Sequence, residues 1–460
     1  MTQARFNTIE LNNLLELTRR LSATLHMSRE AIVMANLEPA DLSAVEAARR
    51  IAAGSLTAET LIRSCLERIE QREPQVRAFE HIAANEAICT AKALDKGPSC
   101  GPVQGLPFAA KDNYDTFDMP TTCGSPIYAG NRPACDASTV ALARAAGAIL
   151  VGKTVMTEFA YVKPGKTRNP HDPTRAPGGS SSGSAAAVAA GMVPIALGSQ
   201  TVGSVIRPAA FCGAAAFKPT YHLLPVTGIK GMAWSLDTAG VFGRTVADCA
   251  LFVDGLLGTD YTAVLECTEP PSVVLCHTHD WPDAQPVAGA ALEEARSRFT
   301  KAGAKVRAIE LPSNFSALRE SLLVVLAFEM AKVLAPEAAR HHHLLSPQLQ
   351  EQLERGRTTH FADYSRAKLA TAAYRARLGD LFGDADVLMA HASPGEAPVG
   401  DAYTGFSFFN GVCTLLGMPC VNVPGLKGPN GMPVGVQAIG RIGEDARTLA
   451  AAHWMEVRLT

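Results

Sequence analysis

Two turns rich in glycine and serine carry hydroxyl groups that could do nucleophilic chemistry. They lie in residues 178–220, GGSSSGSAAAVAAGMVPIALGSQTVGSVIRPAAFCGAAAFKPT, where an alanine-rich helix and a strand are expected between them. Small residues let a backbone approach a ligand closely, and a serine hydroxyl in such a turn can attack a carbon centre or relay a proton. Neighbouring backbone N–H groups can line an oxyanion hole. Serine–glycine turns are also common in flexible loops, so the first turn alone does not establish catalysis.

The segment resembles the signature sequence of the amidase signature family. The matching parts are GGSSSGSAAAVAAG, the GSxxxGS turn and PAAFCGAAAFKPT. GLPFAAKDN at residues 105–113 resembles the segment that supplies the family's lysine, and residues 147–160, 235–248 and 415–444 are similar to further family blocks. Several blocks in the right order over most of the chain make the resemblance specific.

The resemblance implies a Ser–Ser–Lys triad. Ser204 would be the nucleophile, Ser180 the bridging serine and Lys111 the base; the family spaces its two serines by 24 residues, as 204 − 180 does here. Ser181 would hold the lysine amine by a hydrogen bond. The oxyanion hole would be formed by the backbone N–H groups of Thr201, Val202, Gly203 and Ser204.

The role of Lys111 has a physical requirement. An exposed lysine has a pKa of about 10.4 and is almost fully protonated at neutral pH, so it cannot accept a proton. Burial disfavours the charged form and lowers the pKa by several units. Lys111 follows the apolar run LPFAA, as a residue at the buried end of a strand would. Without this context it would be interpreted as an ordinary strand-end lysine.

Three positions in or just after the second turn depart from the family pattern. Gln200 stands where the family usually has an aspartate, and Arg207 lies three residues after Ser204 where the family's arginine lies two after. A coupled change is one interpretation, because a buried guanidinium that loses its carboxylate must find other partners. Val202 replaces a small residue and is expected to stiffen the turn and narrow its neighbourhood.

The substrate pocket is predicted from sequence neighbourhood alone. Tyr128, Met156 and Phe159 are the main candidates, with Tyr161, Tyr403, Phe406, Phe409 and the less favoured His391 beside them. Their apolar, aromatic character favours an uncharged or aryl substrate.

The elements that must position these residues follow from hydrophobic periodicity. Strands are expected at residues 106–110, 148–151, 273–276, 305–309, 387–389 and 419–423, and helices at 44–53, 55–71, 138–146 and 288–302. Strands that alternate with helices imply a sheet that is mostly parallel and buried on both faces. We therefore predict a single-domain α/β/α sandwich over residues 41–460 with a mixed, mostly parallel central sheet, the amidase signature fold. Residues 1–40 are predicted to be an N-terminal helical extension.

Composition and charge narrow the class of protein. The chain has 460 residues, is 47% hydrophobic and has a formal net charge of −2 without a long run of one sign, which argues against nucleic acid or a membrane as partner. Eleven cysteines without CxxC pairs indicate reduced thiols and a cytoplasmic location. The histidines at 341–343 point in different directions on a helix and lack partners at ligand spacing, so we expect no metal and no organic cofactor.

The predicted function is hydrolysis of a linear carboxamide, or of a related anilide or carbamate C–N bond, through an acyl-enzyme on Ser204. The partners would be a small-molecule amide and water; a homodimer is left open. The alternative is the amidase-type subunit of a tRNA-dependent amidotransferase, and a non-catalytic scaffold is a third option that the intact triad positions disfavour. The acyl group and the leaving amine stay open.

Overall fold

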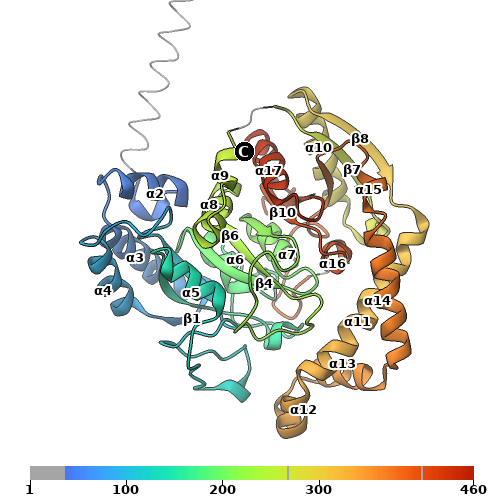
Figure 1. The fold of residues 1–460 in the computed structure, drawn as a ribbon, viewed down its shortest axis with the longest axis horizontal. Helices are drawn as coiled ribbons and strands as arrows, with labels where there is room; N and C mark the ends of the chain where they lie inside the picture. The colour runs from blue at the N-terminus through green and yellow to red at the C-terminus, as the bar shows by residue number, and fades with distance from the viewer. Residues whose placement is uncertain (1–36, 267–268, 406–407) are drawn as a thin grey trace, which may run out of the picture.

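An eleven-stranded sheet crosses the computed structural model, which describes residues 37–266, 269–405 and 408–460 (Figure 1). The strand order is β1-β3-β2-β4-β6-β5-β10-β11-β9-β7-β8. The strands are β1 (Phe79–Ile82), β2 (Pro107–Lys111), β3 (Ile149–Thr154), β4 (Ile195–Gln200), β5 (Ala215–Lys218), β6 (Thr238–Gly243), β7 (Ser272–His277), β8 (Lys305–Glu310), β9 (Val387–His391), β10 (Cys420–Lys427) and β11 (Pro433–Ile439). All six strands expected from the sequence are therefore confirmed.

The sheet is mixed, as predicted, but its parallel pairs are in the minority. Among the described strands, β2 pairs in parallel with β3 and β4, and β7 with β8 and β9. The other six pairings are antiparallel, including the run β4-β6-β5-β10-β11-β9 through the middle. The expectation of a mostly parallel sheet was wrong because the alternating strand–helix pattern does not reveal where a strand reverses direction.

The helices confirm the α/β/α layering. They are α2 (Ala44–Ala52), α3 (Ala58–Val76), α4 (Ala84–Leu94), α5 (Ser138–Ala145), α6 (Ser182–Ala189), α7 (Ile206–Cys212), α8 (Val246–Leu257), α9 (Tyr261–Val264), α10 (Pro286–Lys301), α11 (Ala317–Val333), α12 (Ala335–His341), α13 (Pro347–Thr358), α14 (Phe361–Arg375), α15 (Leu378–Phe382), α16 (Phe408–Leu415) and α17 (Asp445–Leu459). The helix predicted for the first 40 residues lies almost wholly outside the described residues, which begin at Leu37. No helix in the described ranges is both long and apolar enough to span a membrane.

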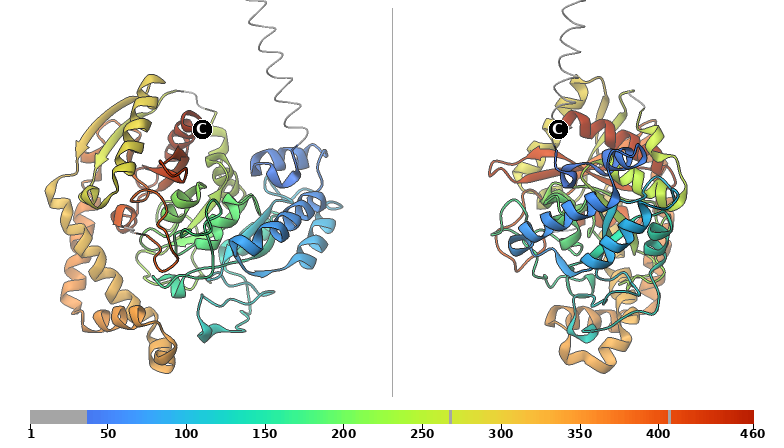
Figure 2. Two further views of the ribbon diagram at one scale, coloured as in Figure 1. Left: turned by 180° about the vertical axis from the view of Figure 1, so that it is seen from behind. Right: turned by 90° about the vertical axis from the view of Figure 1, so that its left-hand side faces the viewer.

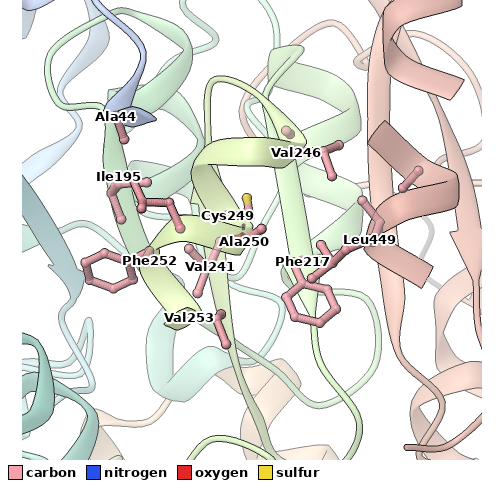
Figure 3. Close-up of a cluster of buried hydrophobic side chains, with 14 of the residues drawn as sticks. Ala44, Ile195, Phe217, Val241, Val246, Cys249, Ala250, Phe252, Val253 and Leu449 are labelled. Atoms are coloured by element: carbon pink, nitrogen blue, oxygen red, sulfur yellow. Dashed lines mark hydrogen bonds between the residues drawn. The ribbon is translucent and has the colours of Figure 1, made fainter. Parts of the chain in front are cut away.

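One core lies between the sheet and helices α5, α8, α10 and α17. Figure 3 shows Phe252 of α8 on the side of Ile195 and Phe217 of β5 on the side of Leu449 of α17, all within this core. Helix α8 begins at a capping box, in which the Thr245 side chain and the Asp248 carboxylate each bind the other residue's backbone N–H. The opposite face is covered by α3, α4, α6 and α7 around a second, alanine-rich core.

Helices α11 to α14 form a layer along one side of the molecule (Figures 1 and 2). Their apolar side chains, including Leu318, Leu322 and Met330, share a third core with Met156 and Phe159. This layer therefore lies against the segment that follows β3, which contains two of the pocket residues predicted from the sequence.

Replacing Phe252 with alanine tests the main core. The side chain is fully buried and its ring lies 5.6 Å from that of Phe108. We expect Phe252→Ala to lower the free energy of unfolding by about 3–5 kcal/mol, because apolar burial is lost and a cavity remains. Phe361→Ala is the matched control, since that ring is 68% exposed. Equal urea denaturation midpoints for the two variants would contradict this description of the core.

Candidate active site

Lys111 is the last residue of β2 and is completely buried. Its Nζ donates to Ser180 Oγ at 2.7 Å, to Ser199 Oγ at 2.9 Å and to the Ser199 carbonyl at 3.3 Å. Strands β2 and β4 are parallel neighbours, so the lysine and Ser199 reach the same edge of the sheet. The structure thus brings two of the three predicted triad residues, Lys111 and Ser180, into direct contact.

Burial lowers the pKa of Lys111 from its ordinary value to about 7. The carboxylate of Asp237 opposes this shift, while the guanidinium of Arg207 adds to it. Among the described residues Lys111 forms no ion pair, and its partners are uncharged oxygens. The amine is therefore partly neutral near pH 7, which is the state that can accept a proton.

Ser180 is held by contacts on both sides of its peptide. The Gly179–Ser180 bond is cis, and the Ser180 carbonyl accepts a hydrogen bond from Thr157 N at 3.3 Å. The preceding carbonyl, Gly179 O, accepts from the guanidinium of Arg207. The loop then enters α6 at Ser182. Ser180 is 1% exposed, so its hydroxyl lies in an environment from which bulk water is excluded.

Ser204 ends the turn that connects β4 to α7. Its carbonyl accepts from Ser181 N at 3.4 Å, so the two serine turns lie side by side. The residue is 6% exposed. The catalytic roles of Ser204, Ser180 and Lys111, and of the backbone N–H groups of Thr201–Ser204, stay predictions.

Gln200 provides a neutral substitute for the aspartate expected in this turn. Its Oε1 accepts from the backbone N–H groups of Val205 at 2.8 Å and Ile206 at 3.1 Å, where α7 begins. Its Nε2 donates to Thr414 Oγ1 at 2.9 Å. A carboxylate could accept the first two hydrogen bonds but could not donate the third. The amide therefore ties the turn to α16.

Arg207 is buried beside this turn without a carboxylate partner among the described residues. Its guanidinium donates to the carbonyls of Gly179 and Gly405, the latter at 3.0 Å. Burial lowers its pKa to about 10. The coupled change inferred from the sequence thus has a structural counterpart, because Gln200 carries no charge and the guanidinium uses backbone oxygens.

One support residue, Ser181, differs from the prediction, and two others, Ser199 and Asn113, were missed by it. The lysine amine was expected to hydrogen-bond Ser181, but it donates to Ser199 Oγ instead, while Ser181 Oγ donates to the Ser199 carbonyl at 3.2 Å. Asn113 Nδ2 also donates to Ser199 Oγ, at 3.1 Å. Both Ser199 and Asn113 lie within the motif segments that carry the lysine and the second turn, so their positions were the available signal. The local backbone conformation decides which serine side chain points toward Lys111.

Val202 contacts helix α16 through both its backbone and its side chain. Thr414 Oγ1 donates to the Val202 carbonyl at 2.9 Å. A Cβ added to Gly411 would lie 2.8 Å from Val202 Cγ1, so this glycine leaves room for the valine. The valine that departs from the family pattern is therefore accommodated by a close approach of α16.

The predicted pocket residues lie next to the triad but are largely packed. Met156 and Phe159 are each 2% exposed, and the Tyr128 ring lies 5.9 Å from that of Phe159. Thr157, between Met156 and Phe159, donates to the Ser180 carbonyl, so this segment borders the site. Tyr403 is 54% exposed. Phe406 and the side chain of Phe409 fall outside the described residues.

A cavity of about 230 Å³ lies next to Ser199, the hydrogen-bond partner of Lys111. Asn113, Ser199, Thr201 and Asp237 line it. Asp237 accepts from Thr201 Oγ1 at 2.6 Å and from two backbone N–H groups, and burial raises its pKa to about 6. Asp237 therefore fixes the start of the second turn.

His391 and two buried cysteines, Cys212 and Cys276, take no part in these contacts. His391, at the end of β9, packs 4.2 Å from the ring of Trp281. Within the described ranges no group of three or more His, Cys, Asp or Glu side chains is arranged to hold a metal ion. Burial raises the pKa of the Cys212 thiol, and that of Cys276 to about 12. Neither thiol has the low pKa of a nucleophilic cysteine.

Comparisons with known proteins show the family of the chain. Residues 60–449 match the family model Amidase. The A subunit of glutamyl-tRNA(Gln) amidotransferase from Chloroflexus aurantiacus is 33% identical over 470 residues, covering 90% of this chain and 96% of that protein. Its counterpart from Symbiobacterium thermophilum, which carries the same name, is 33% identical, covering 91% and 97%.

Solved structures are similar over the same extent. A structure from work on a vestigial protein complex and the origins of an s-triazine catabolic enzyme superimposes with a TM-score of 0.84 at 29% identity, covering 90% of this chain and 98% of that one. The peptide amidase of Stenotrophomonas maltophilia gives a TM-score of 0.79 at 27% identity, covering 91% and 97%. The chain belongs to the amidase signature family.

The pH dependence of the rate tests the lysine. Lys111 must be neutral to accept a proton, and its pKa is about 7. Turnover at limiting substrate should therefore rise about tenfold per pH unit below this pKa and level off above about pH 8. Lys111→Met should leave at most a residual rate, and that rate should not rise with pH around 7. A rate that stays flat from pH 5 to 9, or a midpoint near 10, would argue against a lowered lysine pKa.

Ser199→Ala tests the missed support residue. It removes an acceptor from the lysine amine, so kcat should fall about 10- to 100-fold as the amine loses its orientation. The pH midpoint should also move down. In the wild type the hydrogen bond to Ser199 stabilises the charged form of the lysine amine, so its loss lowers the pKa of Lys111. Ser182→Ala is the control in the neighbouring turn, since that hydroxyl donates to Val155 O at 3.3 Å. If the midpoint of the pH–rate profile is unchanged in Ser199→Ala, Ser199 contributes only by packing.

Proposed function

We propose that the chain cleaves a carboxamide C–N bond through a covalent acyl-enzyme on Ser204. The observation that carries this proposal is the buried hydrogen bond between Lys111 Nζ and Ser180 Oγ, at 2.7 Å. It joins a base of lowered pKa to a hydroxyl that can relay a proton, next to the turn that ends at Ser204. Membership of the amidase signature family supports amide cleavage as the class of reaction.

In the acylation step, Ser204 Oγ bonds to the substrate's carbonyl carbon while its proton passes to Ser180 Oγ. The Ser180 proton passes at the same time to the neutral amine of Lys111. The substrate oxygen becomes negative, and backbone N–H groups of the Thr201–Ser204 turn stabilise it. The proton then returns through Ser180 to the leaving nitrogen as the C–N bond breaks.

In the deacylation step, water takes the place of the amine. Its proton follows the same route through Ser180 to Lys111 while its oxygen bonds to the acyl carbon. The ester bond to Ser204 Oγ then breaks, and the proton returns to that oxygen. No net proton is lost by the protein, so Ser180 and Lys111 are ready for another turnover.

The substrate we propose is a small, uncharged amide, with anilides and carbamates as related substrates of the same chemistry. The proposal is supported by the apolar packing of Met156, Phe159 and Tyr128 around Thr157, whose backbone N–H binds the Ser180 carbonyl. No organic cofactor is needed for this chemistry. We place the reaction in the cytoplasm, in keeping with the free state of all ten described cysteines.

A second candidate function is that of the A subunit of a tRNA-dependent amidotransferase. The curated relatives carry that name and support it more strongly than they support a stand-alone amidase. The first half of the chemistry would be the same, since an amide would acylate Ser204 and ammonia would leave as the C–N bond breaks. The difference is that partner subunits would then be required to pass the ammonia to an acceptor.

Labelling of Ser204 tests the acyl-enzyme. A fluorophosphonate should label one serine, and peptide mapping should place it in residues 198–208. Ser204→Ala should abolish both labelling and turnover while the fold is retained, because the change removes one buried oxygen. Lys111→Ala should slow labelling, since the hydroxyl remains but its base is lost. Labelling that maps elsewhere, or Ser204→Ala turnover above a few per cent of wild type, would overturn the triad.

Ammonia release by the purified chain separates the two candidates. A stand-alone amidase should release ammonia or amine from aryl or aliphatic amides without any partner protein. The screen would compare aryl amides, aliphatic amides, carbamates and glutamine at equal concentration. Release that occurs with glutamine alone, and rises at least tenfold when candidate partner proteins are added, would favour the amidotransferase function instead.

A further inference from the structure

An apolar cavity of about 200 Å³ lies between the sheet and helices α11, α15 and α16. Three adjacent strands contribute to its lining, through Ile439 of β11, Ala390 of β9 and Cys276 of β7. Leu381 of α15 and Leu416 of α16 line it as well. None of these five residues is more than 6% exposed, so the space is enclosed by packed side chains. Cavities with such a lining offer little to water and take up apolar molecules.

The size and the chemistry of the cavity favour an aromatic ring as its occupant. An apolar cavity of about 150 Å³ is sufficient for benzene, so this larger one accommodates a ring with a small substituent. Three of its lining residues carry sulfur, namely Cys276, Cys413 and Met418, and Phe315 lines it too. Sulfur atoms and aromatic side chains both make favourable contacts with aromatic rings. The lining therefore suits an aromatic ligand better than an aliphatic one.

The rim of the cavity is polar and carries more negative than positive charge. Arg319 lines it and is 43% exposed, so this side reaches the surface. The guanidinium pairs with Asp280 at 3.2 Å and with Asp283 at 3.4 Å. Two carboxylates around one guanidinium disfavour an anionic ligand. Asp280 also lines the cavity, and a carboxylate that binds Arg319 through Oδ1 can accept a further hydrogen bond from a ligand's N–H or O–H group.

Helix α16 separates this cavity from the second serine turn. Val412 and Leu416 of the helix line the cavity. Thr414 of the same helix contacts the turn instead, because its Oγ1 donates to the Val202 carbonyl at 2.9 Å. In the described parts of the chain, the lining includes no triad residue and no residue of the turn that ends at Ser204. A molecule in the cavity would therefore leave Ser204 open to a substrate.

We propose that this cavity binds a small, uncharged aromatic molecule that carries one hydrogen-bond donor, at a site separate from the triad. The ring lies among the apolar and sulfur-containing side chains, and the donor faces Asp280 at the rim. Aromatic amines have this chemistry. They are also the leaving groups of anilides, so a product of the proposed reaction is a ligand of this second site. Only this last link rests on the proposed function.

The test titrates the full chain with aniline, toluene and benzoate at neutral pH and follows its methyl groups by NMR. Aniline and toluene have the same shape, but only aniline carries a donor. Aniline should bind with a Kd of about 1 mM or below, toluene at least threefold more weakly and benzoate at least tenfold more weakly. Nuclear Overhauser contacts from aniline to the methyl groups of Leu381, Leu388 and Leu416 should place the ring in the cavity. Ser204→Ala should bind aniline equally, so a failure of the proposed function would leave this result unaffected.

Two substitutions separate filling of the cavity from loss of the acceptor. Ala390→Leu places a larger side chain in the cavity and should weaken aniline binding at least tenfold. Ala372→Leu is the matched control, since Ala372 is exposed on α14. Asp280→Leu should weaken aniline binding at least threefold and leave toluene binding unchanged, which a general loss of packing would not produce.

The proposal is overturned if aniline contacts methyl groups elsewhere, if Ala390→Leu binds aniline as well as Ala372→Leu does, or if the ratio of aniline to toluene affinity is unchanged in Asp280→Leu. It is also overturned if saturating aniline prevents labelling of Ser204 by a fluorophosphonate, because the ligand would then occupy the active site. The contacts seen in the wild type keep the test decisive if Ala390→Leu does not fold.

Discussion

The structure depends on keeping one lysine amine dry, oriented and largely without a counter-charge. Lys111 Nζ has three oxygen acceptors and is fully buried, with burial bringing its pKa to about 7. A permanently charged amine at this depth would cost several kcal/mol unless an ion pair compensated it. A carboxylate in contact would have removed that cost but would also have kept the proton on the lysine. Hydroxyl and carbonyl oxygens satisfy the amine without fixing its charge.

The fold meets this requirement by crowding small residues around the end of β2. Gly198 is one example, because a Cβ there would lie 2.5 Å from the Phe242 ring and 2.9 Å from Ser181 Oγ. Gly183 is another, where a Cβ would lie 2.2 Å from the Ala78 carbonyl. Helix α6, made of serine, glycine, alanine and valine, therefore packs close enough to the sheet to exclude water. The glycine–serine–alanine composition of this region follows from the need to bury the lysine.

The strands and the serine turns could be predicted because they depend on residues that are close together in the sequence. Each expected strand lies where its apolar run is, and α6 and β4 lie between the two serine turns as expected. What failed depends on contacts far apart in sequence. Arg207 binds the carbonyl of Gly405, 198 residues away, and Gln200 donates to Thr414, 214 residues away. Strand direction is likewise set by packing across the whole sheet, so most pairings are antiparallel although the strands alternate with helices.

A lysine base must be neutral at the working pH, and the protonation state of Lys111 can be observed without a substrate. Lysine labelled with ¹³C at the ε carbon would give one resonance per side chain, and the resonance lost in Lys111→Met identifies Lys111. Its chemical shift, followed from pH 5 to 11 by NMR, reports ionisation of the adjacent amine. We expect a midpoint near 7, in line with the burial of this amine. A midpoint above 9 would mean that the lysine is charged at neutral pH and cannot be the base.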